Sequence, residues 1–527
     1  MLAVLSGCGT NSGDSPGTPT SPKAGTASYL NEQAFPITKE PITLKVFVAS
    51  TGNQVDYNKM LLWQEYEKKT GIRIEWIQAP ANAADKRNLL LASNDLPDII
   101  LKDNIDIITQ ADYGSQGVFV KLNDLIDKYG PNVKKALDKY PDVKKGLSMP
   151  DGSIYSLGYI DDGSSTKIGN KLFINQKWLD NVGMKMPETT DDFYKVLKAF
   201  KEKDPNKNGL ADEVPFSVPY GIGDLNLFLA GSFGLLNKGL ANPDFDLDDN
   251  TNKLRFIYTQ SGYRDMLEYL NKLYTEKLLD NEIFTLKSTQ FTAKSEQGLI
   301  GAANAPHTTA FGQKHGGEYY GVPTVLKGPK GYQYMSIARS SLRNVGNFII
   351  TKANKYPEAS MRWVDFFYSE EGIKQYFMGF EGKTYNVVNG EYVYTDEIQK
   401  NPNGFTLDQA VGQYLPYGGG NNPTIITDKY YKGGDNEPRT LQVVEQLKKS
   451  FPKDVWAPFS YKKEESEAIV AIRTDIRNYV AEMRAQFVTG KAPLSQWDTY
   501  VATLQKMGVD EYLKVSQVAY ERYANTK

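Results

Sequence analysis

The chain has 527 residues, with 61 basic and 63 acidic side chains and a formal net charge of −2 at pH 7. Charges this evenly balanced exclude a global field that would attract nucleic acid or anionic lipid. Two histidines and one cysteine exclude a histidine-rich metal centre, disulfides and thiolate clusters, so any chemistry must rest on carboxylates.

The amino terminus resembles the end of an export signal. Residues 1–8 are mostly apolar and end in Leu5-Ser6-Gly7-Cys8, which is similar to a bacterial lipobox, where the cysteine becomes the lipid-carrying first residue. No Lys or Arg precedes this run, which indicates a truncated or misassigned start. Residues 9–38 are expected to form a flexible tether, because Gly, Ser, Thr, Pro and Ala dominate its first part and cannot bury a core.

Strands and helices alternate in the next 60 or so residues. The apolar patterns predict strands at 42–48, 72–77 and 98–101, with helices at 60–69 and around 87–91 between them. This order predicts a parallel sheet with helices on its faces. Ligands of such sheets bind beyond the carboxyl ends of the strands. We therefore expect Asn53 and Asn104, in the loops that follow two of these strands, to contact a ligand.

A predicted helix with Phe193, Val196, Leu197 and Phe200 on one face, capped by Thr189 or Thr190, leads into a loop rich in oxygen ligands. The loop opens with the D-x-[DN]-x-[DN]-G half of an EF-hand. It departs from that motif later, since Pro215 stands at position 12. The predicted calcium ligands are Asp204, Asn206, Asn208, the Leu210 carbonyl, Asp212 and Glu213. The alternative is a polar turn without metal.

Later elements are mainly helical. A strand is predicted at 346–351 and a helix at 357–368. An apolar stripe from Ile469 to Phe487 predicts a long helix that Gly490 ends, and Ser495 is expected to cap the next helix. Apart from the leader, no apolar stretch approaches the roughly 18 residues of a membrane-spanning helix.

Several segments together carry a resemblance to a known family. The chain resembles the family 1 extracellular solute-binding proteins of ABC importers, in the large-chain group of LplA-type lipoproteins and alginate-oligosaccharide-binding proteins. The matching segments span residues 151–155, 173–179, 189–216, 363–372, 381–385 and 474–522. The resemblance covers nearly the whole chain after the tether.

The resemblance implies an α/β, two-lobed periplasmic-binding-protein-like fold (type II) with a hinge and a helix-rich second lobe. We expect residues 39–160 plus about 300–352 in the N-terminal lobe, and 161–299 plus 353–527 in the C-terminal lobe. It further implies an oligosaccharide ligand, ABC permease subunits as partners, and a structural calcium ion away from the sugar. The protein is expected to be a monomer without enzymatic activity, lipid-anchored through Cys8 on the extracellular face of the bacterial membrane.

Sugar sites combine aromatic rings with polar side chains, and 34 tyrosines suit this role. Trp63, Trp178, Trp363 and Trp497 lie in helical patterns and are interpreted mainly as core. Better candidates lie in irregular segments, and Arg339 and Arg343 could clamp a carboxylate. The remaining predicted ligand contacts are Tyr159, Asp161, Tyr220, Asn304, His307, Arg339, Tyr414 and Tyr417.

Three alternatives stay open. A secreted glycoside hydrolase would share the leader, the loop and the tyrosines, but no sequence setting singles out two acids as a catalytic pair. A binding protein for a non-sugar solute would share the fold. An adhesion or scaffold lipoprotein would need repeats or β-sandwich spacing, and neither is visible in the sequence.

Overall fold

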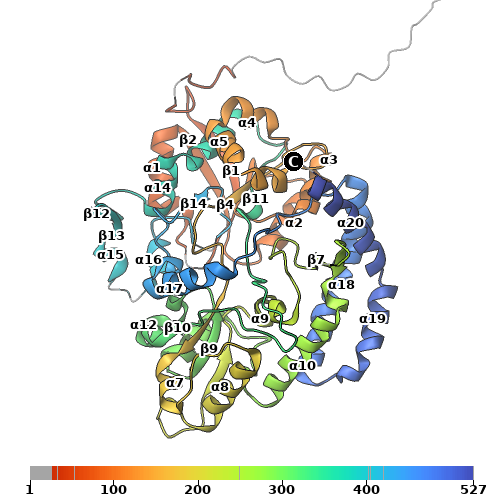
Figure 1. Ribbon diagram of the computed structural model, residues 1–527. Coiled ribbons are helices and arrows are strands. Elements are labelled where there is room, and N and C mark those ends of the chain that lie inside the picture. Colours follow the sequence, from red (N-terminus) through yellow and green to blue (C-terminus); the bar gives the residue numbers. More distant parts are fainter. Residues whose placement is uncertain are drawn as a thin grey trace, which may run out of the picture.

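The computed structural model describes residues 27–525 except residues 33, 53, 249, 402, 404 and 419 and the side chain of residue 313. The predictions for Cys8, the leader and residues 9–26 of the tether therefore lie outside the described residues. The predicted tether is wrong for residues 27–38, because Leu30 and Ile37 are buried in the core of the first sheet. Two mixed sheets lie one above the other, each with helices around it, and the C-terminal helices run along one side of the molecule (Figure 1). The predicted two-lobed α/β fold is confirmed.

The first sheet has six strands in the order β14-β4-β11-β3-β1-β2. Strand β1 pairs in parallel with β2 and β3, as the alternating apolar pattern predicted, but β11 is antiparallel to both β3 and β4. The strands are β1 Ile42–Ala49, β2 Ile72–Ala79, β3 Ile99–Leu101, β4 Leu157–Asp161, β11 Leu342–Ile350 and β14 Ile425–Ile426.

Helices from two distant parts of the chain surround this sheet and form its core clusters. They are α1 Leu61–Thr70, α2 Ala83–Ser93, α3 Ile107–Ser115, α4 Asn123–Tyr129, α5 Pro131–Lys139, α6 Pro141–Leu147, α13 Pro357–Asp365, α14 Glu370–Met378, α15 Asp396–Gln399 and α16 Leu407–Val411, with a hairpin of β12 Tyr385–Val388 and β13 Glu391–Tyr394. Trp63 of α1 stacks on Trp363 of α13 with ring centroids 5.4 Å apart, so both are core residues as predicted.

The second sheet has four strands in the order β10-β5-β9-β6. These are β5 Lys171–Asn175, β6 Val214–Ser217, β9 Ile300–Ala305 and β10 Tyr319–Gly321, and a separate hairpin joins β7 Phe245–Leu247 to β8 Leu254–Phe256. The surrounding helices are α7 Gln176–Val182, α8 Thr190–Glu202, α9 Ile222–Ala230, α10 Ser261–Thr275, α11 Ser288–Glu296, α12 Gly312–His315, α17 Pro438–Leu447, α18 Lys463–Thr489, α19 Trp497–Lys506 and α20 Val509–Asn525.

Two helices show how local sequence sets the element boundaries. Thr189 and Asp192 form a capping box at the start of α8, and the apolar face from Phe193 to Phe200 is buried. Gly490, with φ of 74°, ends α18 in the left-handed region. The predicted cap by Ser495 is wrong, because a 3-10 turn precedes α19 and Gln496 takes the capping position without a side-chain hydrogen bond.

The lobe boundaries differ from those expected in two segments. Strand β9 pairs with β5 and β6, which places residues from 300 to about 341 with the second sheet. Helices α13 and α14 pack in the core of the first sheet, so residues from 353 to about 430 belong with that sheet. The chain therefore crosses between the sheets at residues 162–170, 322–341 and 427–437. Long-range pairing, which the linear pattern does not encode, decides these boundaries.

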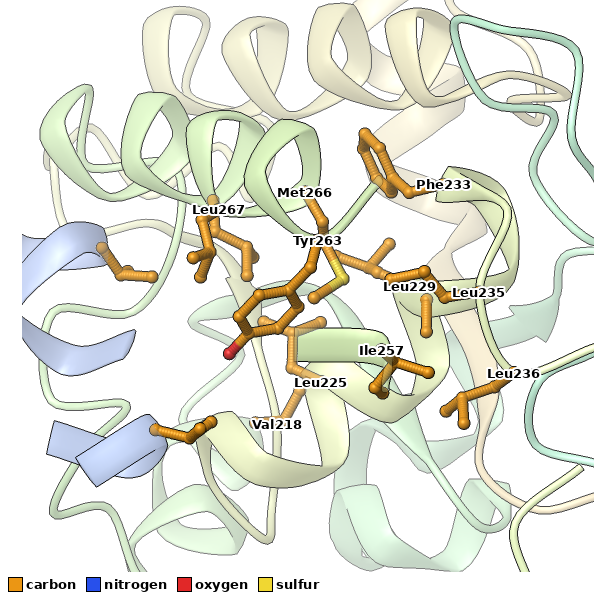
Figure 2. Packing of buried hydrophobic residues seen from close by; sticks show 14 of the residues in the cluster. Val218, Leu225, Leu229, Phe233, Leu235, Leu236, Ile257, Tyr263, Met266 and Leu267 are labelled. Atoms are coloured by element: carbon orange, nitrogen blue, oxygen red, sulfur yellow. The ribbon is translucent and has the colours of Figure 1, made fainter. Parts of the chain in front are cut away.

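Figure 2 shows part of the largest core cluster, in the second lobe, where Tyr263 and Met266 of α10 face Leu225 and Leu229 of α9. Within the ranges described, no helix combines the length and apolar character needed to span a membrane.

A buried lysine holds a glycine-rich loop of the first lobe. Lys102 follows β3 at φ of 59° and is 2 % exposed. Its Nζ donates to the carbonyls of Pro416 and Gly418 at 2.6 and 3.2 Å and to Oδ1 of Asn422 at 2.7 Å. Burial lowers the pKa of Lys102 to about 7.

This lysine predicts a pH dependence of stability. Between about pH 7 and 10.5 the unfolded chain binds a proton at Lys102 that the folded protein releases, so the free energy of unfolding rises with pH by up to about 1.4 kcal/mol per unit. We expect Lys102→Met to remove this rise, measured by urea unfolding from pH 7.5 to 9.5. Lys45→Met, at a half-exposed position, is the control and should keep the wild-type slope. Parallel curves for wild type and Lys102→Met would contradict the assignment.

Candidate functional site

A cluster of charged residues lies where the chain crosses between the sheets. Asp161 ends β4, Lys171 begins β5, and Arg343 lies near the start of β11. Arg339 lies in the second crossing and Asp435 in the third. The carboxyl end of the first sheet therefore meets the second lobe at this cluster, which is where ligands of α/β sheets bind.

Asp161 is fully buried and anchors the first crossing. Its Oδ1 accepts hydrogen bonds from the Gly163 N–H at 3.0 Å and from Thr166 Oγ1 at 2.6 Å. Its Oδ2 accepts no hydrogen bond from the described residues but lies 3.8 Å from Nη1 of Arg343. Burial raises the pKa of Asp161, and the Arg343 charge opposes that rise.

The two arginines have different surroundings. The guanidinium of Arg343 lies 5.4 Å from the ring centre of Tyr159, and Tyr159, Asp161 and Asp435 raise its pKa although burial works against this. Burial and the adjacent Arg343 charge lower the pKa of Arg339 to about 10. Within the described residues, the Arg339 guanidinium makes one hydrogen bond, a long one of 3.4 Å from Nη1 to the Thr166 carbonyl.

Asp435 joins the third crossing to the second sheet. Lys171 Nζ lies 3.4 Å from Asp435 Oδ1 and donates to the Pro306 carbonyl at 2.8 Å. Burial lowers the pKa of Lys171 to about 8, partly offset by Asp435. The pKa of Asp435 is lowered, because Lys171, His307 and the two arginines outweigh the effect of burial. The hydroxyl of Tyr431 also donates to Asp435, at 3.1 Å.

A hollow of about 970 Å³ opens between the lobes beside this cluster. Tyr220 and His307 line it from the second lobe and Asp408 from α16 of the first. Tyr220 is 56 % exposed, yet burial and the charges of Asp408, Asp224 and Asp435 raise its pKa to about 12. An aromatic ring that is exposed to solvent and also close to several protein charges is typical of a residue on the wall of an open cleft.

A second hollow, of about 250 Å³, also borders the cluster, at Arg343. Asn104 and Arg343 line it from the first sheet, and Arg473 and Arg477 from α18. Arg473 lies 3.6 Å from Asp106, the N-cap of α3, and Arg477 pairs with Asp244 at 2.7 Å. This hollow is thus bounded by ion pairs, one of which links α18 to α3.

The structure brings six of the predicted ligand residues to this region. Tyr159, Asp161 and Arg339 lie in the charged cluster, and Tyr220, His307 and Asn104 line the hollows. Their common position at strand ends and crossings follows from the fold, as the sheet topology brings these segments together.

Three predicted contacts are not on these walls, and a fourth is not described. Asn53 lies outside the described residues. Asn304 in β9 is fully buried, Tyr417 is 4 % exposed and packs on Phe377 and Tyr431, and Tyr414 bonds Glu397 at 2.7 Å on the first lobe. Glycine-rich surroundings suggested ligand contact for Tyr414 and Tyr417, but these tyrosines instead support the loop around them.

Sequence reasoning missed Lys171, Asp224, Asp408 and Asp435. Asp435 follows Gly433 and Gly434, which is a usable signal because an acid in a glycine-rich turn often faces a ligand. No comparable signal marks Lys171 or Asp408. Lys171 begins a strand that is otherwise apolar, and Asp408 lies inside a short helix.

The predicted calcium loop is folded around its own side chains. Asp204 accepts from the N–H groups of Asn208 and Gly209 at 3.1 Å each, and the amides of Asn206 and Asn208 donate to Asp212. Oε1 of Glu213 is buried without a hydrogen-bond partner among the described residues. Burial and the charges of Asp212 and Asp204 raise the pKa of Glu213. An unpartnered carboxylate oxygen on which the charges of two other carboxylates act suits a hard cation.

The six predicted calcium ligands of the 204–213 loop are not arranged around one point in this structure. Among the residues that the structure describes, no three acidic, histidine or cysteine side chains meet in a ready metal cluster. The amide nitrogens of Asn206 and Asn208 point at Asp212. The loop thus offers the right donor types, and a cation would require these amides to present their oxygens instead.

Comparison with known proteins agrees with this architecture. The family model described as bacterial extracellular solute-binding protein matches residues 51–374. The chain is 31 % identical to the fructooligosaccharide ABC transporter substrate-binding protein FusA of Streptococcus pneumoniae, over 100 % of this chain and 97 % of that protein. It is 24 % identical to the lipoprotein LipO of Bacillus subtilis, over 91 % and 92 %.

Solved structures show the same fold. FusA in complex with kestose superposes with a TM-score of 0.77 at 29 % identity, covering 92 % of this chain and 100 % of that one, and an EF-hand mutant of FusA with fructo-nystose gives the same values. The alginate-binding protein AlgQ2 without calcium ion gives a TM-score of 0.77 at 26 % identity, covering 93 % and 100 %.

Proposed function

Because this chain belongs to the bacterial extracellular solute-binding proteins, we propose that it captures an oligosaccharide between its lobes and delivers it to the permease of an ABC importer. The observation that carries the proposal is the hollow of about 970 Å³, which both lobes line with polar side chains and Tyr220. This volume is at the upper end of the roughly 300–1,000 Å³ of small-molecule sites. The site has room for several sugar units.

The charges around the site favour a neutral oligosaccharide. Carboxylates of the protein, Asp161 and Asp435 among them, act on both Arg339 and Arg343, so a uronate would compete with them for either guanidinium. Sugar hydroxyls, by contrast, bond equally well to carboxylates and guanidinium groups. The hollow itself is lined by charged side chains of both signs, which are Glu296, Asp408, Glu437, Lys314 and Arg439.

The proposed function is reversible binding coupled to closure of the lobes, without covalent chemistry. FusA and AlgQ2 are named as binding proteins, and solute-binding proteins are not enzymes. A ligand that contacts both lobes binds the closed arrangement better than the open one and shifts the population toward it. The three crossings at 162–170, 322–341 and 427–437 would absorb that motion. The protein would act as a monomer.

The first test is thermal melting of the Cys8→Ala chain with kestose and nystose, compared with galacturonate and alginate oligosaccharides of equal length. A ligand at 100 times its Kd stabilises the native state by about 2.7 kcal/mol, so the neutral sugars should raise the midpoint and the uronates should not.

Tyr220→Ala should weaken binding of the neutral sugar at least fivefold with little change in melting, since the ring is exposed. Tyr332→Ala, another exposed tyrosine outside the hollow, is the control. A shift with uronates alone would refute the neutral ligand.

We further propose that the 204–213 loop binds a structural calcium ion through Asp204, Asn206, Asn208, the Leu210 carbonyl, Asp212 and Glu213. The unpartnered, buried oxygen of Glu213 supports this, as do the EF-hand mutant of FusA and the calcium-free form of AlgQ2 among the similar structures. Calcium would neutralise the acids and tie the end of α8 to β6. The loop precedes β6 and Tyr220 follows it, so the ion would lie at the strand end away from the sugar.

Calcium removal should therefore lower stability and spare binding. In excess calcium the wild-type midpoint should exceed that in chelator by several degrees, and Asp204→Ala with Asp212→Ala should abolish the difference. Nystose affinity of the folded double variant should stay within about twofold of wild type. Asp248→Ala removes a similar turn-forming carboxylate elsewhere and should retain the calcium response. Identical wild-type midpoints with calcium and chelator would rule the ion out.

The lipid anchor is proposed from the lipobox-like Leu5-Ser6-Gly7-Cys8 and from the similarity to LipO, which is named a lipoprotein. A diacylated cysteine would hold the protein on the extracellular face of the membrane, and residues 9–26 would be the tether that lets the lobes reach the permease. In cells that export the protein, Cys8→Ala should move it from the membrane fraction to the medium. Ser15→Ala, in the tether, should leave it on the membrane. Retention of the Cys8→Ala protein would exclude this anchor.

A further inference from the structure

A third hollow, of about 320 Å³, lies in the second lobe between α9, α10 and α18. Each helix contributes residues at the three- and four-residue spacing of a single face. From α9 and α18 these include Gly223, Asn226, Ala230, Arg477, Val480 and Arg484. We call it the α9–α18 pocket.

Polar atoms in this pocket lack hydrogen-bond partners within the described part of the chain. Asn226 is 4 % exposed and neither its Nδ2 nor its Oδ1 is bonded. Tyr263 is 1 % exposed with an unbonded hydroxyl, and Nε of Arg484 is also unbonded. A buried polar group without a partner is unfavourable, because it has lost its hydrogen bonds to water without replacing them. Their convergence on one hollow indicates that the pocket takes a polar occupant.

The direction of the Tyr263 side chain supports this. In Figure 2 its hydroxyl points away from Phe233 and Leu235, toward the C-terminal helices drawn in blue. Burial raises the pKa of Tyr263 to about 12, while the charge and the donor groups of Arg484 lower it, so the guanidinium lies near the hydroxyl without forming a hydrogen bond of standard geometry. The ring is thus anchored in the core while its hydroxyl faces the pocket.

The pocket adjoins the interlobe site. Asp224, on its wall, accepts a hydrogen bond from Asn170 of the first crossing at 3.0 Å, and the Arg339 charge acts on it. Pro243, Asp244 and Arg477 line both this pocket and the hollow of 250 Å³ that Arg343 also lines. The Asp224 charge also acts on Tyr220, which lines the hollow of 970 Å³. A sugar chain that runs from that hollow past Asp224 therefore reaches the pocket.

The lining matches an uncharged polyol. The amide of Asn226 offers a donor and an acceptor, the Tyr263 hydroxyl offers both, and Arg484 offers donors. The carboxylates of Asp224 and Asp244 are balanced by the guanidinium groups of Arg477 and Arg484, so an ionic ligand gains nothing. Leu227 and Met266 supply an apolar wall for the carbon face of a ring. The volume is at the small end for a ligand site, which fits a single unit.

We propose that the α9–α18 pocket is a subsite for one uncharged sugar unit at the end of the bound oligosaccharide, held by Asn226, Tyr263 and Arg484. This rests on the proposed function. The subsite makes the affinity depend on chain length, because only an oligosaccharide long enough to reach the pocket bonds these groups.

The test is calorimetric titration of the full chain with sucrose, kestose, nystose and fructosylnystose. Wild-type affinity should rise along this ladder until the pocket is filled. Tyr263→Phe should weaken binding of the members that fill it at least fivefold, with less than twofold change for shorter ones, and Asn226→Ala should do the same. Tyr500→Phe is the matched control, since this buried tyrosine also has an unbonded hydroxyl but does not line the pocket.

The outcomes separate the two proposals. Unchanged affinities in Tyr263→Phe and Asn226→Ala, or equal weakening of every sugar, would overturn the subsite while the binding function stands. A wild-type protein that binds no member of the ladder would overturn the neutral oligosaccharide ligand, and the subsite with it.

Discussion

The charged cluster at the three crossings is the constraint on which the rest of the structure depends. Asp161, Arg343, Asp435 and Lys171 are each mostly removed from water, and buried charges are tolerated only when they are paired and hydrogen-bonded. Each charge comes from a different segment of chain. Their mutual attraction therefore fixes how the two sheets are joined, and the hollows that border the cluster take their walls from the segments that it holds.

Shifted pKa values of this kind often mark catalytic sites. Here the shifts come mainly from burial and from neighbours of opposite charge: Arg343 opposes the rise at Asp161, and Lys171 helps to lower the pKa of Asp435. A network in which acids and bases offset one another presents many hydrogen-bonding groups without leaving one poised to react. That suits the recognition of hydroxyl groups and agrees with a family of binding proteins.

Other interactions, outside the charged cluster, stabilise each lobe. In the first lobe, Lys102 ties β3 to the segment at 416–422, and Asn421 of that segment accepts a hydrogen bond from Asn344 of β11 at 2.6 Å. In the second lobe, the long α18 packs along α10, and it also contacts α3 of the first lobe, where Arg473 lies 3.6 Å from Asp106. Relative motion of the lobes would therefore change the α18–α3 contact as well as the crossings.

The sequence by itself determined the local structure and the class of the fold. Periodicity defined β1, α1, β2 and α8, glycine marked the end of α18, and the spacing of oxygen ligands singled out the 204–213 loop, because these signals act over a few residues. Residues at strand ends, such as Asp161 and Asn104, were predicted for the same reason. Tertiary structure alone decided that β9 joins the second sheet and α13 the first. It also decided that Lys171 and Asp435, 264 residues apart in the chain, meet. The same holds for Asn226, Tyr263 and Arg484, which line one pocket. These depend on long-range pairing and burial, which no local pattern encodes.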